Sequence, residues 1–103
     1  MILIVVTVGL FAIGLYGVLS RRDLVAILAS VEIMLGAATM LLVGLGMTAE
    51  VSQVAADASH IEAIGVLLLV LAASETSVAL ALVVAVARHL RTTRVDEVAE
   101  VRG

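Results

Sequence analysis

Three long apolar stretches, separated by short polar segments, dominate the chain. They cover residues 2–19, 24–47 and 63–87. At about 1.5 Å of rise per residue, helices of these lengths reach roughly 27, 36 and 37 Å, and the hydrocarbon core of a bilayer is about 30 Å thick. The pattern predicts an all-α integral membrane protein with three transmembrane helices. They form one membrane domain, residues 1–103, which ends in a polar tail at residues 88–103.

Composition narrows the possible chemistry. Hydrophobic residues make up 63% of the sequence, whereas average proteins contain about 45–50% apolar residues. Cysteine is absent, so disulfides, thiolate metal sites and iron–sulfur clusters are excluded. Proline is also absent, and we expect helices without proline kinks. No cofactor, metal or nucleic acid is predicted to bind, and any electron transfer must take place in a partner.

The positions of the basic residues predict the topology. All of them are arginine: Arg21, Arg22, Arg88, Arg91, Arg94 and Arg102. The first two follow the first apolar stretch and the others follow the third, whereas residues 48–62 contain acidic residues but no basic one. The positive-inside rule therefore predicts an outer N-terminus, a cytoplasmic first loop and a cytoplasmic C-terminal tail. A cleaved signal is not expected, because no basic residue precedes the first stretch and no small-residue cleavage site follows it.

Two glutamates lie near the middle of the second and third stretches. Glu32 and Glu75 are the only charged residues there. An ionisable group at the bilayer centre costs about 2.5–3.5 kcal/mol and is by default a sign of a proton or ion pathway. Counted from the cytoplasmic ends of their spans, the glutamates lie about 12 and 18 Å deep, so about 6 Å apart along the membrane normal. Water could bridge the two carboxyls if their helix faces meet.

A carboxyl in this environment is suited to proton transfer. Burial disfavours its charged form, so it holds a proton and releases it when hydration or a nearby charge changes. Two coupled carboxyls respond to each other's charge. The hydroxyl residues that could support a water chain beside them are Ser30, Thr39, Ser74, Thr76 and Ser77. The alternative is that each glutamate is neutral and only joins helices through hydrogen bonds.

Charged and polar residues at the span ends carry weaker signals. Arg21 and Arg22 precede Glu32 by about 15 Å along a helix, too far for a fixed salt bridge but near enough to bias a proton entrance. His60 and His89 fall at span ends, so we interpret them as interfacial residues and not as haem ligands, which belong in a buried pocket. Glycine occurs in every stretch and favours close packing between helices within a larger complex.

Several segments resemble the small K subunit of proton-pumping NADH:quinone oxidoreductase, respiratory complex I. Residues 14–24 read GLYGVLSRRDL, similar to the family's GLYG-x-L-x-RRN stretch. Residues 30–37 read SVEIMLGA, similar to SIELMLNA, and residues 70–81 read VLAASETSVALA, similar to VAAAEAAVGLA. Residues 95–98, VDEV, resemble a VDEL-like tail. The resemblance covers all three spans in order, with both glutamates in register.

The resemblance implies a multi-pass subunit of the membrane arm in a bacterial plasma (inner) membrane. Glu32 and Glu75 would belong to a hydrated polar axis that links quinone reduction to proton translocation, and Arg21 and Arg22 would form a functionally sensitive loop. Flavin, iron–sulfur clusters and quinone would be bound by partner subunits and not by this chain. The implied partners are neighbouring small membrane subunits, an antiporter-like subunit and the lipid bilayer.

Two departures from the family pattern affect the expected water route. Gly36 stands where the family has an asparagine one helical turn after Glu32, which removes a hydrogen-bonding side chain. Residues 60–63, HIEA, lack the family's glycine–glutamine pair.

The sequence pattern is also compatible with other functions. The nearest is the small subunit of a cation/proton antiporter or membrane-bound hydrogenase, and the least specific is a purely structural packing subunit. An ATP synthase rotor subunit would have two spans and one carboxylate. A small multidrug transporter would have four spans and cation-stacking aromatic residues, and aromatic residues make up only 2% of this chain.

Overall fold

The computed structural model describes residues 1–48 and 55–100. The helices in this part of the chain are α1 (Ile2–Ser20), α2 (Leu24–Gly46), α3 (Ala55–Leu90) and α4 (Val95–Glu100). α1, α2 and the segment His60–Leu90 of α3 are each long and apolar enough to cross a membrane. The prediction of an all-α chain with three such helices is confirmed. Glu50 and Arg102, which entered the topology argument, lie outside the described residues.

The longest helix, α3, extends beyond the apolar stretch that predicts it. It begins at Ala55 and ends at Leu90, whereas the stretch covers residues 63–87. The apolar pattern marks the part that fits the hydrocarbon core, and backbone hydrogen bonding continues the helix into polar residues on both sides. The tail also contains regular structure, because residues that follow the end of α3 form the short helix α4, which is six residues long.

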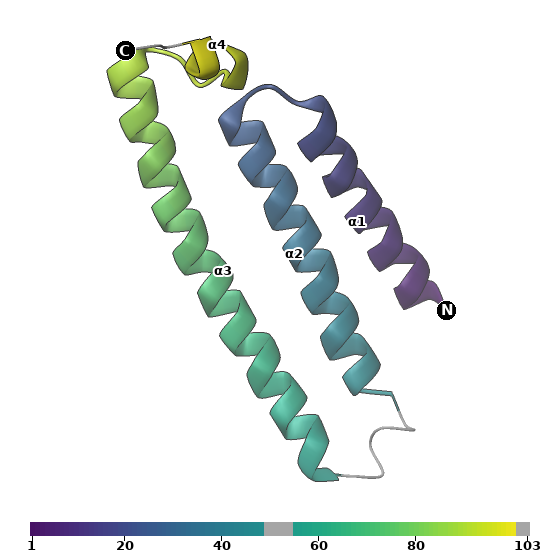
Figure 1. Ribbon diagram of the computed structural model, residues 1–103. Coiled ribbons are helices and arrows are strands. Elements are labelled where there is room, and N and C mark those ends of the chain that lie inside the picture. The colour runs from purple at the N-terminus through teal and green to yellow at the C-terminus, as the bar shows by residue number, and fades with distance from the viewer. Residues whose placement is uncertain (49–54, 101–103) are drawn as a thin grey trace.

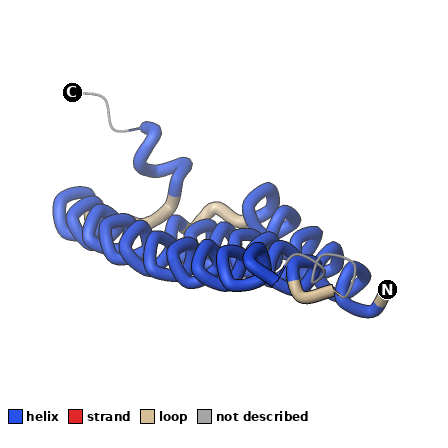
Figure 2. Tube along the Cα trace, turned by 90° about the horizontal axis from the view of Figure 1, so that it is seen from below, coloured by secondary structure: helices blue, strands red, loops and turns tan. Residues whose placement is uncertain are grey.

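The three long helices lie side by side in one layer, with α2 between α1 and α3 (Figure 1). The same layer viewed from below is thin (Figure 2), and the principal extents of the chain are 59 × 24 × 15 Å. Among the described residues, those well buried between the helices are small, and they include Thr7, Ser30 and Ala37. Large apolar side chains such as Leu67 and Leu82 lie exposed on the broad faces. A single layer of this kind buries its apolar surface against lipid or other membrane subunits.

α1 and α2 approach each other closely through glycine. A Cβ atom added at Gly14 would lie 2.8 Å from the carbonyl oxygen of Ser30, and one added at Gly17 would lie 2.1 Å from the Ser30 hydroxyl oxygen. Small residues allow such contact between membrane helices, where dispersion and hydrogen bonds provide the association energy. By contrast, apart from its chain neighbours and the nearby backbone of its own helix, a Cβ at Gly9 or Gly36 would have no described atom within 4 Å.

The arginine-rich end of the layer joins two distant parts of the chain. Asp23 caps α2, because its carboxylate accepts a hydrogen bond from the Val25 amide at 3.0 Å. α3 ends where Arg91 adopts a left-handed backbone conformation, with φ 57°. The segment that follows runs back over the α1–α2 loop and forms an antiparallel bridge between Asp23 and Arg94. In Figure 1, α4 and this loop lie at the same end of the layer.

Candidate functional site

The α2–α3 contact contains a hydrogen bond between two side chains of different helices. The hydroxyl group of Thr76 on α3 donates to Oε1 of Glu32 on α2. Glu32 and Thr76 are both half-buried. A glutamate found in the middle of an apolar stretch therefore points between two helices and has a polar partner there. Glu75, the residue before Thr76 on α3, lies only about 1.5 Å along the helix from this contact and therefore close to the depth of Glu32.

The antiparallel register of α2 and α3 produces this contact. Towards the opposite end from the arginines, Ile61 packs at Gly46, and Val43 packs at Gly65. Eleven residues separate Gly65 from Thr76, and eleven separate Glu32 from Val43. Because both helices rise by about 1.5 Å per residue, the contact between Glu32 and Thr76 is in register with the contact between Val43 and Gly65.

Thr76 has the chemistry to serve Glu32 in either protonation state. Its hydroxyl oxygen also lies 2.9 Å from the carbonyl oxygen of Ala72, one turn earlier on α3. A hydroxyl has one proton to donate and two lone pairs that accept. When Glu32 is charged, Thr76 donates to its carboxylate. When Glu32 is protonated, its O–H donates to Thr76, and the Thr76 proton turns to Ala72.

Glu75 occupies a different surface from Glu32. Adjacent residues on a helix are separated by about 100°, so Glu75 points away from the direction in which Thr76 meets α2. Its side chain is exposed. The hydroxyl groups of Ser74 and Ser77, also exposed, donate to the carbonyl oxygens of Val70 and Ala73 on their own helix, each at 2.9 Å. Of the three hydroxyls beside Glu75 in the sequence, only Thr76 reaches across to α2 within the described residues.

The two hydroxyl residues predicted near Glu32 lie on different sides of α2. Ser30 is buried against Gly17 of α1 and donates to the Ala26 carbonyl oxygen at 2.8 Å. Two residues separate it from Glu32, which amounts to about 200° around the helix. Ser30 therefore belongs to the α1 contact and not to the side of α2 that carries Glu32.

Thr39 lies on the α3 side of α2 and borders a hollow of about 290 Å³ between the helices. Its hydroxyl donates to the Leu35 carbonyl oxygen at 2.9 Å. The hollow is also lined by Glu62, Val43, Gly65, Val66 and Leu69. The sequence interpretation missed Glu62 as a neighbour of this side of α2. The sequence feature that could have identified Glu62 is its position three residues before Gly65, since residues three and four apart share a helix face.

Arg21 and Arg22 are exposed and line a hollow of about 520 Å³ at the arginine-rich end. The hollow is completed by Ser20, Asp23, Ala26 and Arg94. Arg94 was not among the predicted site residues, although the tail brings it beside the loop. The sequence feature that could have identified Arg94 is local, because acidic residues follow it two and three positions later.

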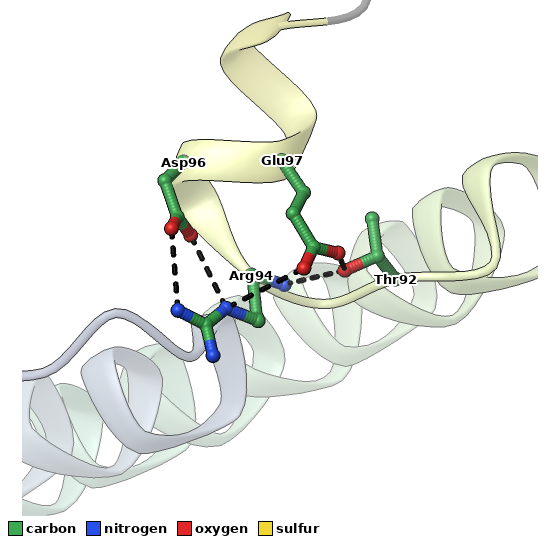
Figure 3. Close-up of polar contacts among 4 residues, drawn as sticks. All are labelled: Thr92, Arg94, Asp96 and Glu97. Atoms are coloured by element: carbon green, nitrogen blue, oxygen red, sulfur yellow. Dashed lines mark hydrogen bonds and ion pairs between the residues drawn. The ribbon is translucent and has the colours of Figure 1, made fainter.

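Arg94 is held by the acidic side chains of α4 (Figure 3). Its Nη2 and Nε atoms lie 3.2 and 3.4 Å from the two carboxylate oxygens of Asp96, and Nε lies 3.6 Å from Oε1 of Glu97. The hydrogen bonds from Arg94 hold the pKa of Asp96 below its usual value, and the same pair raises the pKa of Arg94. Arg94 is therefore paired within the tail, while its side chain borders the loop's hollow.

The described residues contain no group of three or more His, Asp or Glu side chains arranged to hold a metal ion, and the chain has no cysteine. His60 and His89 are exposed and lie near the two ends of the long apolar part of α3.

Comparison with known proteins gives one consistent result. Residues 2–103 match the sequence model of the family described as NADH-ubiquinone/plastoquinone oxidoreductase chain 4L. The chain is 41% identical over 95 residues to NADH-quinone oxidoreductase subunit 11 of Thermus thermophilus, which covers 91% of this chain and 90% of that relative.

Relatives from other bacteria agree. Subunit K of Deinococcus radiodurans is 39% identical over 94 residues, which cover 91% of this chain and 84% of the relative. Subunit K of Desulfitobacterium hafniense is 39% identical over 88 residues, which cover 85% and 80%. The match extends over all three long helices and the tail, so the chain belongs to the NADH-ubiquinone/plastoquinone oxidoreductase chain 4L family.

Proposed function

We propose that this chain is a membrane-arm subunit of a proton-translocating NADH:quinone oxidoreductase, in which Glu32 carries a proton-transfer step between α2 and α3. Family membership supports the first part. The observation that carries the second is the hydrogen bond from Thr76 to Glu32 across the two helices. A purely structural glutamate requires one fixed partner, whereas Thr76 offers an arrangement for both the charged and the neutral carboxyl.

The two glutamates have different parts in this proposal. Glu32 takes up and releases a proton while it stays hydrogen-bonded to Thr76. Glu75 is exposed at the same depth on the outer surface of α3, where a neighbouring membrane subunit or its water would meet it. A proton or a change in charge would pass between the subunits at Glu75 and reach Glu32 through water. Thr39 and the hollow beside it extend the polar positions of α2 towards the opposite end of the layer.

Redox chemistry belongs to other subunits in this proposal. The relatives are named as subunits of an NADH-quinone oxidoreductase, and the chain contains no cysteine to hold an iron–sulfur cluster. Flavin, iron–sulfur clusters and quinone are assigned to partner subunits. The partners we propose on the membrane side are neighbouring small subunits and an antiporter-like subunit, which would cover the exposed apolar faces of the helix layer.

The proposed topology puts the arginine-rich end in the cytoplasm of a bacterium and the start of α1 outside, in the plasma membrane. Arg21, Arg22 and Arg94 line one hollow at this end, and Arg88 and Arg91 line a second hollow together with Arg94. All five arginines of the described residues thus gather at one end of the layer, as the positive-inside rule requires of a cytoplasmic face.

The decisive experiment replaces Glu32 with glutamine in the assembled complex. Glutamine keeps the size and a hydrogen-bonding group but does not titrate, so we expect Glu32→Gln to lower both quinone reduction and proton pumping while a native gel still shows the full complex. Inverted membrane vesicles allow both activities to be measured together. Normal coupled turnover in the assembled variant would overturn the proton-transfer role and leave a structural packing subunit as the better account.

A further inference from the structure

The C-terminal segment at residues 92–95 is hydrogen-bonded through its backbone to the loop that carries Arg21 and Arg22. The Leu24 amide donates to the Thr93 carbonyl oxygen at 2.9 Å, and the Val95 amide donates to the Arg22 carbonyl oxygen at 2.8 Å. These two bonds flank the antiparallel pair of Asp23 and Arg94. The loop contributes only residues 21–23 between α1 and α2, so the pairing involves nearly all of it.

The tail has its own side-chain network that gives this segment one conformation (Figure 3). The Thr92 hydroxyl donates to Oε2 of Glu97, and the same hydroxyl oxygen accepts a hydrogen bond from the Arg94 amide at 3.2 Å. Arg94 in turn pairs with Asp96 and Glu97. The network therefore ties the segment to the start of α4 and fixes the direction in which its backbone groups face the loop.

From this pairing we infer that residues 92–95 are a positioning segment for Arg21 and Arg22. The proposal rests on the proposed function and on the sequence prediction that these arginines bias a proton entrance towards Glu32. Without the tail, the Arg22 carbonyl and the Leu24 amide would turn to water, and the loop could rearrange. With it, Arg21, Arg22 and Arg94 are held around one hollow of about 520 Å³. The tail and the loop form one functional unit although about 70 residues separate them.

Proline at position 95 removes one of these hydrogen bonds with little other change. Val95 is the first residue of α4, a position where proline is tolerated because its amide makes no bond within the helix. Proline also favours an extended residue before it, which Arg94 already is as a member of the bridge. Val95→Ala is the matched control, because it shortens the side chain but keeps the N–H group.

We expect Val95→Pro to lower proton pumping severalfold in the assembled complex, while Val95→Ala stays close to the wild-type rate. Leu24→Pro, at the first residue of α2, removes the other hydrogen bond and should give a similar loss relative to Leu24→Ala. Because both changes break the same pairing, the double proline variant should lose little more than either single one. Full activity of both proline variants would overturn the proposal.

A second comparison separates positioning from general stability. In a variant that already carries Arg21→Ala and Arg22→Ala, Val95→Pro should cause no further loss, because the groups that it positions are absent. An equal fractional loss in both backgrounds would mean that the tail acts by another route and would overturn the proposal. Failure of the proposed function is distinguishable, because it appears as normal pumping in Glu32→Gln.

The pairing can also be tested without measuring activity. Asp23 and Arg94 face each other as the pair that the two hydrogen bonds flank, and residues at such positions have Cα atoms about 4.5 Å apart, within the range for a disulfide. The chain has no cysteine of its own. Under mild oxidation of the assembled complex, Asp23→Cys with Arg94→Cys should form a disulfide-linked peptide pair in mass spectrometry, and Asp23→Cys with Val98→Cys should not. Absence of the first link, or equal linking of both pairs, would contradict the proposal. This test does not need the proline variants, so it also decides the case in which those variants fail to assemble.

Discussion

The two sides of α2 show what separates a structural helix contact from a candidate functional one. Towards α1, glycines bring the backbones together, and the hydroxyl groups of Thr7 and Ser30 donate to carbonyl oxygens of their own helices. A hollow of about 250 Å³ on this side is bordered by Thr7 and otherwise by apolar residues. Towards α3, a carboxyl on one helix receives a hydrogen bond from the other. Polar groups on the α1 side are satisfied locally, whereas Glu32 depends on a partner across the helices.

This difference gives the same residue type different meanings. Ser30 and Thr76 both carry hydroxyl oxygens within hydrogen-bond distance of the carbonyl oxygen four residues earlier. Only Thr76 also meets an ionisable group. The functional information is therefore in the neighbour and not in the hydroxyl itself.

The largest effect is expected from filling the closest α1–α2 contact. Gly14→Val should prevent stable assembly, because its Cβ would lie 2.5 Å from Cγ of Met34 and 2.8 Å from a backbone oxygen that cannot move aside. Overpacking of this kind typically costs about 1–3 kcal/mol. Gly9→Val is the control on the same helix, since its Cβ has no described atom within 4 Å apart from its chain neighbours and the nearby backbone of α1. The amount of intact complex on a native gel is the measurement, and equal amounts for both variants would refute the structural assignment of this side.

A smaller effect, on turnover and not on assembly, is expected at Thr76. Thr76→Val keeps the shape but removes the hydroxyl, and hydrogen bonds to charged groups contribute about 1.5–3 kcal/mol. If this energy enters the proton-transfer barrier, pumping should fall by roughly tenfold or more. Thr76→Ser should retain most of the activity.

The neighbouring hydroxyl provides the matched control for this loss. Ser77→Ala removes a hydroxyl that binds only the Ala73 carbonyl oxygen of its own helix among the described residues, so it should pump normally. Equal loss in Thr76→Val and Ser77→Ala would mean that the contact across α2 and α3 has no special role.

Removing the second carboxyl should have a still smaller effect than removing the first. Glu75 is exposed on α3, so water or a neighbouring subunit can substitute for part of its function, whereas Glu32 points between two helices. We therefore expect Glu75→Gln to retain several times more proton pumping than Glu32→Gln under the same conditions. A larger loss in Glu75→Gln would reverse the assignment and make the outer surface of α3 the main proton-transfer site.

The sequence predicts the helices of this fold better than it predicts their faces. Long apolar runs with charged residues at their ends are enough to identify three spans, because the thickness of the bilayer sets the length of each span. The same runs are apolar on every side, so they carry little amphipathic signal to show which residues meet a neighbour. For that reason the pattern groups Ser30 with Glu32, and Glu75 with Thr76, although the structure separates both pairs.

The contact between the tail and the loop is missed for a different reason. It depends on backbone amides and carbonyls at residues 22, 24, 93 and 95, and every residue except proline has such groups. The side chains that stabilise the tail, Arg94 and Asp96 among them, are visible in the sequence only as ordinary alternating charges. That the tail meets the loop between α1 and α2 follows from the register of α2 and α3.

The smallest effect is expected at Gly36, one turn after Glu32 on α2. Gly36→Ala should assemble and pump normally, because no described atom lies within 4 Å of the added Cβ apart from the chain neighbours and the nearby backbone of α2. Alanine also loses less conformational entropy than glycine when a helix forms, so the variant should gain about 0.5–1 kcal/mol of stability. Thermal inactivation of the complex would detect this as a slightly higher midpoint temperature. If Gly36→Ala instead lowers pumping while assembly is complete, the open space beside Glu32 is itself needed, as it would be if water occupies it during proton transfer. Gly36→Asn then separates the two causes: a polar side chain that restores pumping implies a need for hydrogen bonding, and one that does not implies a need for the space.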